Sequence, residues 1–402
     1  MERIVFHIDV NSAFLSWEAA RRVKNGEMDI RLIPSAIGGD REKRTGVVLA
    51  KSIPAKKRGI KTGEPVSMAL RKCPELFLAK PDFALYERNS KAFMDICREY
   101  TPLLEKYSID ECFLDMTGMN NIYPDLIATA NEIKNKIKQE LGFTVNIGIG
   151  SNKLLAKMAS DFEKPDKVHT LFDYEIENKL WTLPVRELFT VGGATADKLE
   201  GACIKTVGEL ARMDISVLKA LLGVKLGEHL HAYANGIDAS PVVNSRERAK
   251  CYGNSITLEY DVKNILDAQK ILLSLADSTA TRMRADGAKC LCVSVTIRDL
   301  DFNDRSHQKK FSVSTDITSE IYEACIALIS ELWDRKKALR LIGVSLSELV
   351  YEDDVQLSFF DSDKRDKART LDKTVDSIRN KFGKNMIVRG GVYKNNIREK
   401  NK

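Results

Sequence analysis

A strand-like run with two adjacent carboxylates, KYSIDECFLDMTG at residues 106–118, limits the folds open to this chain. The flanks of the run are apolar, yet Asp110 and Glu111 stand side by side in it, and a buried strand does not accept unpaired charges. One interpretation is a hairpin that bends near Ser108–Cys112, with both acids facing water. The other is a metal site, because carboxylate oxygens are the ligands that Mg²⁺ prefers. The run alone favours the hairpin, so the rest of the chain must decide.

A third acid, Asp9, ends the strand-like run RIVFHIDV at residues 3–10. If the two strands are neighbours in one sheet, the carboxylates of Asp9 and Asp110 can come together. Without a partner they would repel one another and raise each other's pKa. Two divalent cations ~3.5–4 Å apart would remove this repulsion and form a phosphoryl-transfer site, in which one ion activates a hydroxyl and the other holds a triphosphate.

The size and composition of the chain predict a globular protein of several domains. The chain has 402 residues, of which 44% are hydrophobic and 30% charged, and a chain of this length is expected to form two to four domains. No apolar run approaches the ~18–20 residues of a membrane span, and MERIVFHIDV lacks the features of a signal peptide. The eight cysteines include no CxxC pair. We therefore expect a cytoplasmic protein with reduced thiols, without disulfides and without a zinc site.

The positive charge is concentrated near the C-terminus. Residues 361–402 contain 13 Lys and Arg against 6 Asp and Glu, a net charge of +7, so residues 1–360 sum to −1 within the total of +6. A nucleic-acid partner therefore has to be inferred from local patches and motifs and not from the overall charge.

The first 167 residues read as one α+β unit with an irregular basic insertion over residues 24–79. Apolar residues at helical spacing predict an amphipathic helix over 126–141, and alternation predicts a strand over 143–150. Short helices with Gly turns follow over 168–240. There, VGGATADKL at 191–199 resembles a helix-hairpin-helix, whose backbone N–H groups bind phosphate without reading sequence; a plain helical connector is the alternative.

After a linker at residues 241–249, a second compact unit covers 250–350. Its pattern predicts the order β-α-β-β-α-β, which is a ferredoxin-like layout. The predicted strands and helices are strand 251–260, helix 265–285, strand 289–300, strand 308–314, helix 318–333 and strand 339–348. Three basic clusters lie in this unit, and each is either a solvated face or part of a nucleic-acid surface. They are RMR at 282–284, HQKK at 307–310 and RKKALR at 335–340.

Taken in order, these segments resemble a Y-family translesion DNA polymerase of the DNA polymerase IV-like branch. The resemblance covers residues 3 to about 361. The segment SIDE with its apolar flanks is its most specific part. The segments that carry it are HIDVNSAFLSWE, SIPAKKRGIKTG, YSIDECFLDMTG, GIGSNKLLAKMASDFEKP and QLSFF.

The resemblance implies an α+β right-hand polymerase with a ferredoxin-like palm, small fingers, a helical thumb and a second ferredoxin-like domain, the little finger. With small fingers, the template pocket should tolerate a damaged base. The implied domains are palm 1–22 and 79–167, fingers 23–78, thumb 168–240, linker 241–249, little finger 250–350 and a tail 351–402 with a clamp-binding peptide.

By position, the resemblance implies that Asp9, Asp110 and Glu111 are the catalytic, metal-binding acids. It further implies the Val10 carbonyl as a metal ligand and places Ser108 near the primer end. The expected cofactor is a pair of Mg²⁺ ions, for which Mn²⁺ can substitute.

Two further residues match positions that bind the nucleotide in this family. Phe14 matches the aromatic steric gate, a ring beneath the sugar of the incoming nucleotide that clashes with a 2′-OH; a core aromatic is the plain alternative. Lys164 matches the triphosphate-binding lysine, whereas a lysine without this motif would be a surface residue by default.

The sequence departs from the family at the β- and γ-phosphates. Tyr is usual in the position of Ile53 and Arg in that of Lys56. Lys56 keeps the charge without the bidentate fork of arginine, and Ile53 has no side-chain donor. We therefore expect weaker nucleotide binding or a compensating donor elsewhere, for which Lys57 and Arg58 are candidates.

The pentapeptide QLSFF resembles a sliding-clamp peptide, although a terminal strand that packs on the domain is the alternative. Its apolar side chains would fill a pocket on the clamp while the glutamine makes a polar contact. The residues concerned are Gln356, Leu357, Phe359 and Phe360. Beyond it, helical spacing predicts a helix that either packs on the body or binds a partner; its apolar residues are Leu371, Val375, Ile378 and Phe382.

The implied activity is low-fidelity, template-directed DNA synthesis that bypasses damaged bases, with roles in DNA repair and replication. The enzyme would add dNMP from dNTP to a primer 3′-OH. Its expected partners are primer–template DNA, dNTP and a sliding clamp, and we expect a monomer. Two alternatives remain: a non-catalytic DNA-binding scaffold tethered to the clamp, and a palm-type nucleotidyl cyclase, suggested by GGD at 38–40 but without the strand context that a cyclase turn needs.

Overall fold

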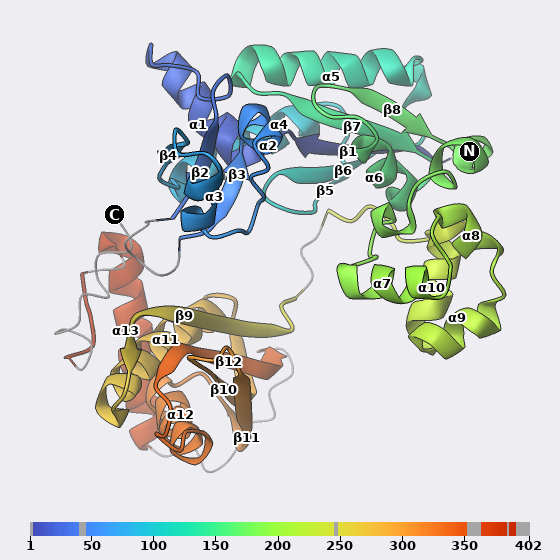
Figure 1. Cartoon of the computed structure of the whole chain (residues 1–402). Helices are drawn as coiled ribbons and strands as arrows, with labels where there is room; N and C mark the ends of the chain where they lie inside the picture. Colours follow the sequence, from blue (N-terminus) through green and yellow to red (C-terminus); the bar gives the residue numbers. More distant parts are fainter. Residues whose placement is uncertain (1–2, 40–45, 245–247, 352–362, 384–385, 391–402) are drawn as a thin grey trace. The chain divides into compact units, whose positions relative to one another are not determined.

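The chain folds into two compact units, the first built from residues 1–42 and 46–246 and the second mainly from residues 247–402. The structure is a computed structural model, and it describes residues 3–39, 46–244, 248–351, 363–383 and 386–390. The division falls inside the expected linker, and both units mix helices and strands (Figure 1). The expected α+β class is confirmed. Within the described residues, no helix is long and apolar enough to cross a membrane.

A five-stranded sheet forms the centre of the first unit. β1 is antiparallel to β6 on one side and to β7 on the other, and β7 is parallel to β8. In sheet order the strands are β5 (Leu104–Lys106), β6 (Glu111–Asp115), β1 (Val5–Val10), β7 (Val145–Gly150) and β8 (Val168–Leu171). β8 belongs to this sheet although it lies beyond the expected palm boundary at residue 167. A four-residue strand carries too little periodicity to be recognised from the sequence.

The two faces of this sheet are covered by different helices. Side chains alternate along a strand, so Phe6, Ile8 and Val10 join the core beneath α1, α4 and α5, while Val5 and His7 face α6. Asp9 has the parity of His7 and therefore lies on the α6 face. The helices are α1 (Ala13–Lys24), α4 (Phe83–Arg98), α5 (Leu126–Leu141) and α6 (Lys153–Asp161), with a 3₁₀ turn η1 (Met119–Asn121) before α5.

The basic insertion is a small sheet with its own core and is not irregular, as the sequence had suggested. Its elements span three to seven residues, too few for periodicity to reveal them. The buried residues include Val48, Ala55, Ile60 and Val66. The elements are β2 (Ser35–Gly38), β3 (Val48–Lys51), α2 (Ile53–Lys57), α3 (Val66–Lys72) and β4 (Phe77–Ala79), with sheet order β3-β2-β4.

The region after β8 is helical, as expected, and has its own core around Leu155, Leu199 and Leu230. Gly192 precedes α7 at the expected helix-hairpin-helix turn, and a Cβ placed there would meet no atom within 4 Å. The backbone of this turn is therefore open to a ligand. The elements are η2 (Asp173–Glu175), η3 (Ile176–Leu180), η4 (Val185–Glu187), α7 (Gly193–Gly201), α8 (Val207–Arg212), α9 (Ile215–Leu222) and α10 (Val224–Ala234).

The second unit has the expected β-α-β-β-α-β order, and its four strands form one antiparallel sheet in the order β11-β10-β12-β9. Two helices pack together on one face of this sheet, and their apolar residues share one core with it. A further helix, α13, follows. The elements are β9 (Cys251–Val262), α11 (Ile265–Ala285), β10 (Ala288–Asp299), β11 (Asp304–Thr315), α12 (Thr318–Leu332), β12 (Leu339–Tyr351) and α13 (Asp363–Phe382).

Candidate active site

The strand pairing brings the three predicted acids to one end of the first sheet. Asp9 is the register partner of Glu111 across β1 and β6, and the Val10 N–H donates to the Asp110 carbonyl at 3.0 Å. β5 and β6 also form a hairpin, in which the Tyr107 and Ser108 N–H groups donate to the Glu111 carbonyl. The 106–118 run is thus a hairpin that sets Glu111 opposite Asp9, and the metal interpretation stays a prediction.

Asp9 is the most enclosed of these carboxylates, with 8% of its surface exposed. Burial raises the pKa of Asp9 to about 7, because the opposing pull of Lys164 does not cancel it and the charges of Glu111 and Asp110 add to it. The Lys164 ammonium contacts Asp9 and also lies 2.8 Å from the Asp161 carboxylate. The site therefore holds more negative charge than its protein cations balance, which favours an added cation.

Glu111 has a different environment. Burial alone would raise the pKa of Glu111, but His7 and Lys157 lower it to about 2. Lys157, on α6, places its Nζ 3.1 Å from both carboxylate oxygens. The His7 ring lies 3.9 Å from Glu111 on one side and bonds Ser160 at 2.7 Å on the other. Glu111 is thus held ionised and fixed in position by α6.

The remaining predicted residues at this end are Asp110 and Ser108. The Ser108 hydroxyl donates to Asp110 Oδ1 at 2.7 Å, and the Asp110 N–H donates back to the hydroxyl at 3.2 Å. This turn fixes the Asp110 side chain without a cation next to it. The Asp110 carboxylate is therefore available as a metal ligand.

The chemistry of these acids suits divalent metal ions. Within the described residues, no group of three or more His, Cys, Asp or Glu has the spacing of a metal site. However, hard cations take carboxylate and carbonyl oxygens, and this set offers three carboxylates beside the Val10 carbonyl. Burial is the main cause of the raised pKa of Asp9, and the charges of Glu111 and Asp110 add to it; a bound cation would oppose both effects.

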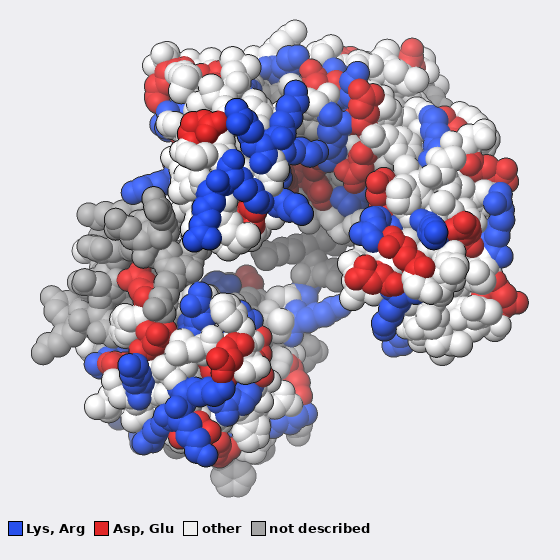
Figure 2. All heavy atoms as spheres, viewed as in Figure 1, with Lys and Arg blue, Asp and Glu red and all other residues white. Residues whose placement is uncertain are grey.

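A cavity of about 330 Å³ opens beside Asp9, between the first sheet and the fingers elements. Its lining includes the predicted Lys56, Lys164 and Ile53. It also includes two basic residues that the sequence reasoning missed, Arg31 and Lys51. Asp9 is the only acid among its lining residues, so the cavity suits an anion. Figure 2 shows Lys and Arg side chains gathered over the part of the first unit that contains α2 and α3.

The proposed compensating donors do not line this cavity. Lys57 and Arg58 are exposed, and Arg58 pairs with Glu75 at 3.3 Å. Lys51 is in a better position, because it lies on β3 and donates to the Thr62 hydroxyl at 3.0 Å. Burial and the neighbouring charge of Lys56 lower the pKa of Lys51, against the pull of Glu64. Sequence reasoning overlooked Lys51 because only the fold makes it part of the cavity that Asp9 also lines.

Phe14 lies near the start of α1, next to the cavity residues Ser12 and Leu15. Its ring stacks on Tyr86 with centroids 4.4 Å apart and planes 7° apart. Trp17 and Phe83 contact it from other sides. The half-buried ring is therefore held among three aromatic rings against the core of the first unit. It does not itself line the cavity, and its role as a steric gate stays a prediction.

Two further residues of the site escaped the sequence reasoning, His7 and Lys157. The alternation of β1 could have revealed His7, because it shares a face with Asp9. Lys157 had no such signal, since a helical lysine is normally a surface residue. The predicted clamp-binding residues Gln356, Leu357, Phe359 and Phe360 lie outside the described residues.

Family models match three parts of the chain. The impB/mucB/samB family matches residues 8–161, and the C-terminal domain of that family matches residues 249–359. A model described as the thumb domain of DNA polymerase iota matches residues 186–238. The three matches coincide with the acidic site, the second ferredoxin-like unit and the helices between them.

Similar proteins support the same assignment. A DNA polymerase IV of Clostridium acetobutylicum is 46% identical over 97% of this chain and 98% of its own length. A DNA polymerase IV of Clostridium kluyveri is 38% identical over 98% of this chain and 99% of its own length. A solved Y-family DNA polymerase chimera has the same fold, with a TM-score of 0.75 at 22% identity, and the match covers 87% of this chain and all of the chimera.

Proposed function

The chain belongs to the impB/mucB/samB family of Y-family DNA polymerases, and we propose that Asp9, Asp110 and Glu111 are the acids with which it performs template-directed DNA synthesis. As a DNA-directed DNA polymerase it depends on divalent metal, as the family does. The observation that carries the proposal is the register of β1 and β6, which sets Asp9 opposite Glu111 at the mouth of a basic cavity. A scaffold does not need this combination, and the family matches favour a polymerase over a cyclase.

We infer two Mg²⁺ ions, with Mn²⁺ as a substitute, held by the three acids and the Val10 carbonyl. When bound, such ions lower the pKa of a primer 3′-OH and neutralise the triphosphate. The protein contributes a fixed Glu111, through Lys157, and a fixed Asp110, through Ser108.

The basic cavity is the proposed site of the dNTP triphosphate. Lys56 and Lys164 stand on opposite walls, since one comes from α2 and the other from the turn after α6. Arg31 adds a third charge, although Asp29 pairs with it at 2.8 Å. The Phe14 ring then limits the room beneath the sugar. In this arrangement the triphosphate lies next to the acids, and the 3′-OH is expected near Ser108.

Bypass of damaged bases is typical of this family, and the small fingers suggest how it is achieved. The described fingers elements are one three-stranded sheet and two short helices. Such a small module leaves room around the template base. We further propose a monomer that binds a sliding clamp through residues 356–360 and acts in the cytoplasm; all eight cysteines are free, which suits a reducing compartment.

Primer extension with purified protein tests the proposal. Asp110→Ala should abolish synthesis with either metal and leave affinity for primer–template DNA nearly unchanged. Asp197→Ala, an exposed acid on α7, is the matched control and should extend primers as the wild type does. Retained synthesis in Asp110→Ala would contradict the assignment. No synthesis by the wild type, with DNA still bound, would favour the scaffold.

A second template with a minor-groove guanine adduct tests bypass. Extension across the adduct by the wild type, with short products on both templates, is the expected result. A complete stop before the adduct would limit the enzyme to other lesions.

A further inference from the structure

Helix α13 leaves its apolar side exposed. The four residues whose spacing predicted this helix form a stripe along one side of it, which we call the α13 stripe: Leu371, Val375, Ile378 and Phe382. Leu371 is 59% exposed and Phe382 58% exposed, and the two middle residues are only half-buried. The helix therefore does not use this stripe as its main contact with the second unit.

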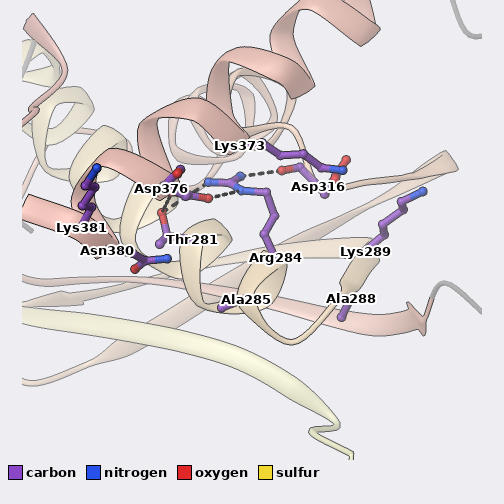
Figure 3. Close-up of a pocket in the computed structure, with 12 residues that line it drawn as sticks. Thr281, Arg284, Ala285, Ala288, Lys289, Asp316, Lys373, Asp376, Asn380 and Lys381 are labelled. Carbon is purple, nitrogen blue, oxygen red and sulfur yellow. Dashed lines mark hydrogen bonds and ion pairs between the residues drawn. The ribbon is translucent and has the colours of Figure 1, made fainter.

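The docking of α13 is ionic. Arg284 of α11, whose side chain is 6% exposed, bonds Asp376 at 2.6 Å and the Asp316 carbonyl at 2.6 Å (Figure 3). On the next turn Arg379 bonds Asp277 of α11 at 2.7 Å. Buried charges of this kind persist only when they are paired, so these contacts fix one side of α13 against the unit.

Further pairs extend the contact to α12. Arg365 bonds Glu320 at 2.7 Å and Arg369 bonds Asp316 at 2.9 Å. The Asp372 carboxylate accepts the Thr318 N–H at 2.7 Å, at the first residue of α12. Because α12 has no side-chain cap of its own, Asp372 supplies one. These ion pairs hold the inner side of α13, and the stripe remains available for a second surface.

Lysines accompany the stripe. At 3.6 residues per turn, Lys364 falls within it and Lys367 beside it, and both are exposed. Within the part of the chain that the structure describes, neither forms an ion pair. An apolar stripe with unpaired lysines fits an apolar groove whose edge carries carboxylates.

We propose that the α13 stripe is a second contact with the sliding clamp, in a groove edged by acidic residues. The inference rests on the proposed clamp peptide at 356–360. Phe360 and Asp363 are three residues apart, at most ~10 Å of chain, and Leu371 lies ~12 Å further along the helix. A protein that holds the peptide therefore lies within ~22 Å of Leu371, close enough for a protein of ordinary size to reach the stripe.

A second copy of the chain is a poorer occupant. Four side chains bury far less than the ~800 Å² per partner of a stable interface. Two copies would also bring their lysines into one small contact, where the positive charges would repel one another. A small contact is effective when a linked one already holds the partner, because the second binding event is then intramolecular. The stripe suits this supporting role.

Binding of the purified sliding clamp to the full chain tests the proposal. Leu371→Ser with Phe382→Ser should weaken clamp binding about tenfold, the loss expected when two partly exposed apolar side chains no longer bury their surface. Primer extension without clamp should stay at the wild-type rate. Leu266→Ser, at a 65% exposed apolar residue on α11, is the matched control and should bind clamp as the wild type does. Phe359→Ala with Phe360→Ala should abolish binding.

The outcomes separate this inference from the proposed function. Wild-type affinity in the stripe variant, with binding lost in the peptide variant, overturns the inference and leaves the clamp peptide intact. No clamp binding by the wild-type chain overturns both. An equal loss of clamp binding in Leu266→Ser overturns the inference in favour of a non-specific apolar contact. A concentration-dependent dimer that the wild type forms and the stripe variant lacks overturns it in favour of a second copy of the chain. Lys364→Glu with Lys367→Glu should also weaken clamp binding. Unchanged affinity would contradict the proposal that acidic residues edge the groove on the clamp.

Discussion

Ile53 lies at the edge of the basic cavity with half of its surface exposed, at the first residue of α2. Its neighbour Lys56 faces the same cavity. A phenol at position 53 would add a donor, and an arginine at position 56 would add a fork that matches phosphate. The two positions therefore control how firmly the triphosphate is held.

Ile53→Tyr with Lys56→Arg should lower the KM for dNTP about threefold to tenfold with little change in kcat, as expected for one or two added hydrogen bonds. Steady-state single-nucleotide insertion measures this. Lys57→Arg is the matched control, because Lys57 is exposed and does not line the cavity. An unchanged KM would mean that Lys51 and Arg31 already supply the missing donors.

Phe14 should control sugar selection because its ring is fixed by Tyr86 behind it. Phe14→Ala should raise the ratio of ribonucleotide to deoxynucleotide insertion by at least about tenfold, a change of roughly 1.4 kcal/mol in transition-state discrimination. Phe83→Ala is the control: this ring touches Phe14 edge-on but is 58% exposed. If both variants discriminate as the wild type does, Phe14 is a core aromatic and not a gate.

At this scale the sequence revealed the acids but not the residues that hold them. Asp9, Asp110 and Glu111 were recognisable because acids are unusual in apolar strands. Lys157 and Lys51 were not, because an exposed-looking lysine on a helix or strand is unremarkable. Their importance depends on how close α6 and β3 come to the acids, which is a property of the tertiary fold.

The contact between β7 and α6 depends on a glycine. A Cβ at Gly148 would lie 1.9 Å from the Ala156 carbonyl oxygen and 2.4 Å from the Ser160 nitrogen, both backbone atoms of α6. This close approach brings Lys157 of α6 within reach of Glu111, which lies on the same face of the sheet.

Gly148→Ala should lower the free energy of unfolding by roughly 3 kcal/mol or more, because backbone cannot move aside as a side chain does. Urea denaturation measures the change. Gly201→Ala, in α7 with no atom within 4 Å of the added Cβ, should be neutral or slightly stabilising. A Gly148→Ala protein as stable as the wild type would show that α6 can shift away from β7.

The docking of α13 should depend on charge. Burial alone would raise the pKa of Asp277, but its bonds from Arg379 and Arg389 outweigh burial and lower that pKa. Because the pKa of Asp277 is lower in the docked state, its ion pairs stabilise docking in full at pH values above the ordinary Asp pKa of about 3.9. This stabilisation is lost as the pH falls through the lowered pKa. Asp277→Asn removes it at every pH.

Hydrogen exchange of α13 tests this dependence. Asp277→Asn should reduce the opening free energy of α13 by about 2–3 kcal/mol, since it leaves Arg379 buried beside a neutral group. Protection of β10 should not change. Asp366→Asn is the control, because Asp366 is exposed and pairs only at 3.4 Å with Arg369. Equal protection of α13 in both variants would mean that apolar contacts hold the helix.

Sequence periodicity was informative in proportion to element length. The helices and strands of the second unit span 12 to 21 residues, and their predicted bounds were correct to within a few residues. β2, β4 and β8 span three or four residues, and none was recognised. For α13 the spacing of Leu371, Val375, Ile378 and Phe382 predicted the helix but not its contact, because ion pairs and not the apolar stripe dock it.

Each of the two units of the molecule has a hydrophobic core of its own. One core of the first unit surrounds Phe6, Trp17 and Phe93, and that of the second surrounds Leu272, Val293 and Ile329. The second unit also presents a polar hollow of about 530 Å³ on its sheet, lined by residues such as Asn254, Thr296 and Arg298. With β11 exposed along most of its length, this sheet is a surface suited to a DNA backbone.

Deletion of residues 247–402 should therefore leave a folded fragment that binds DNA more weakly than the full chain does. The fragment keeps the acids, the basic cavity and the helix-hairpin-helix turn, so it should still extend primers when its concentration is high. Its affinity for primer–template DNA should fall at least about tenfold, and the slope of log affinity against log salt should become shallower, since fewer phosphates are neutralised. Fluorescence anisotropy at several salt concentrations measures both, and Asp110→Ala within the fragment should abolish the remaining synthesis. An unchanged salt slope would place the DNA contacts of this enzyme in its first unit alone, and the sheet of the second unit would then need another ligand.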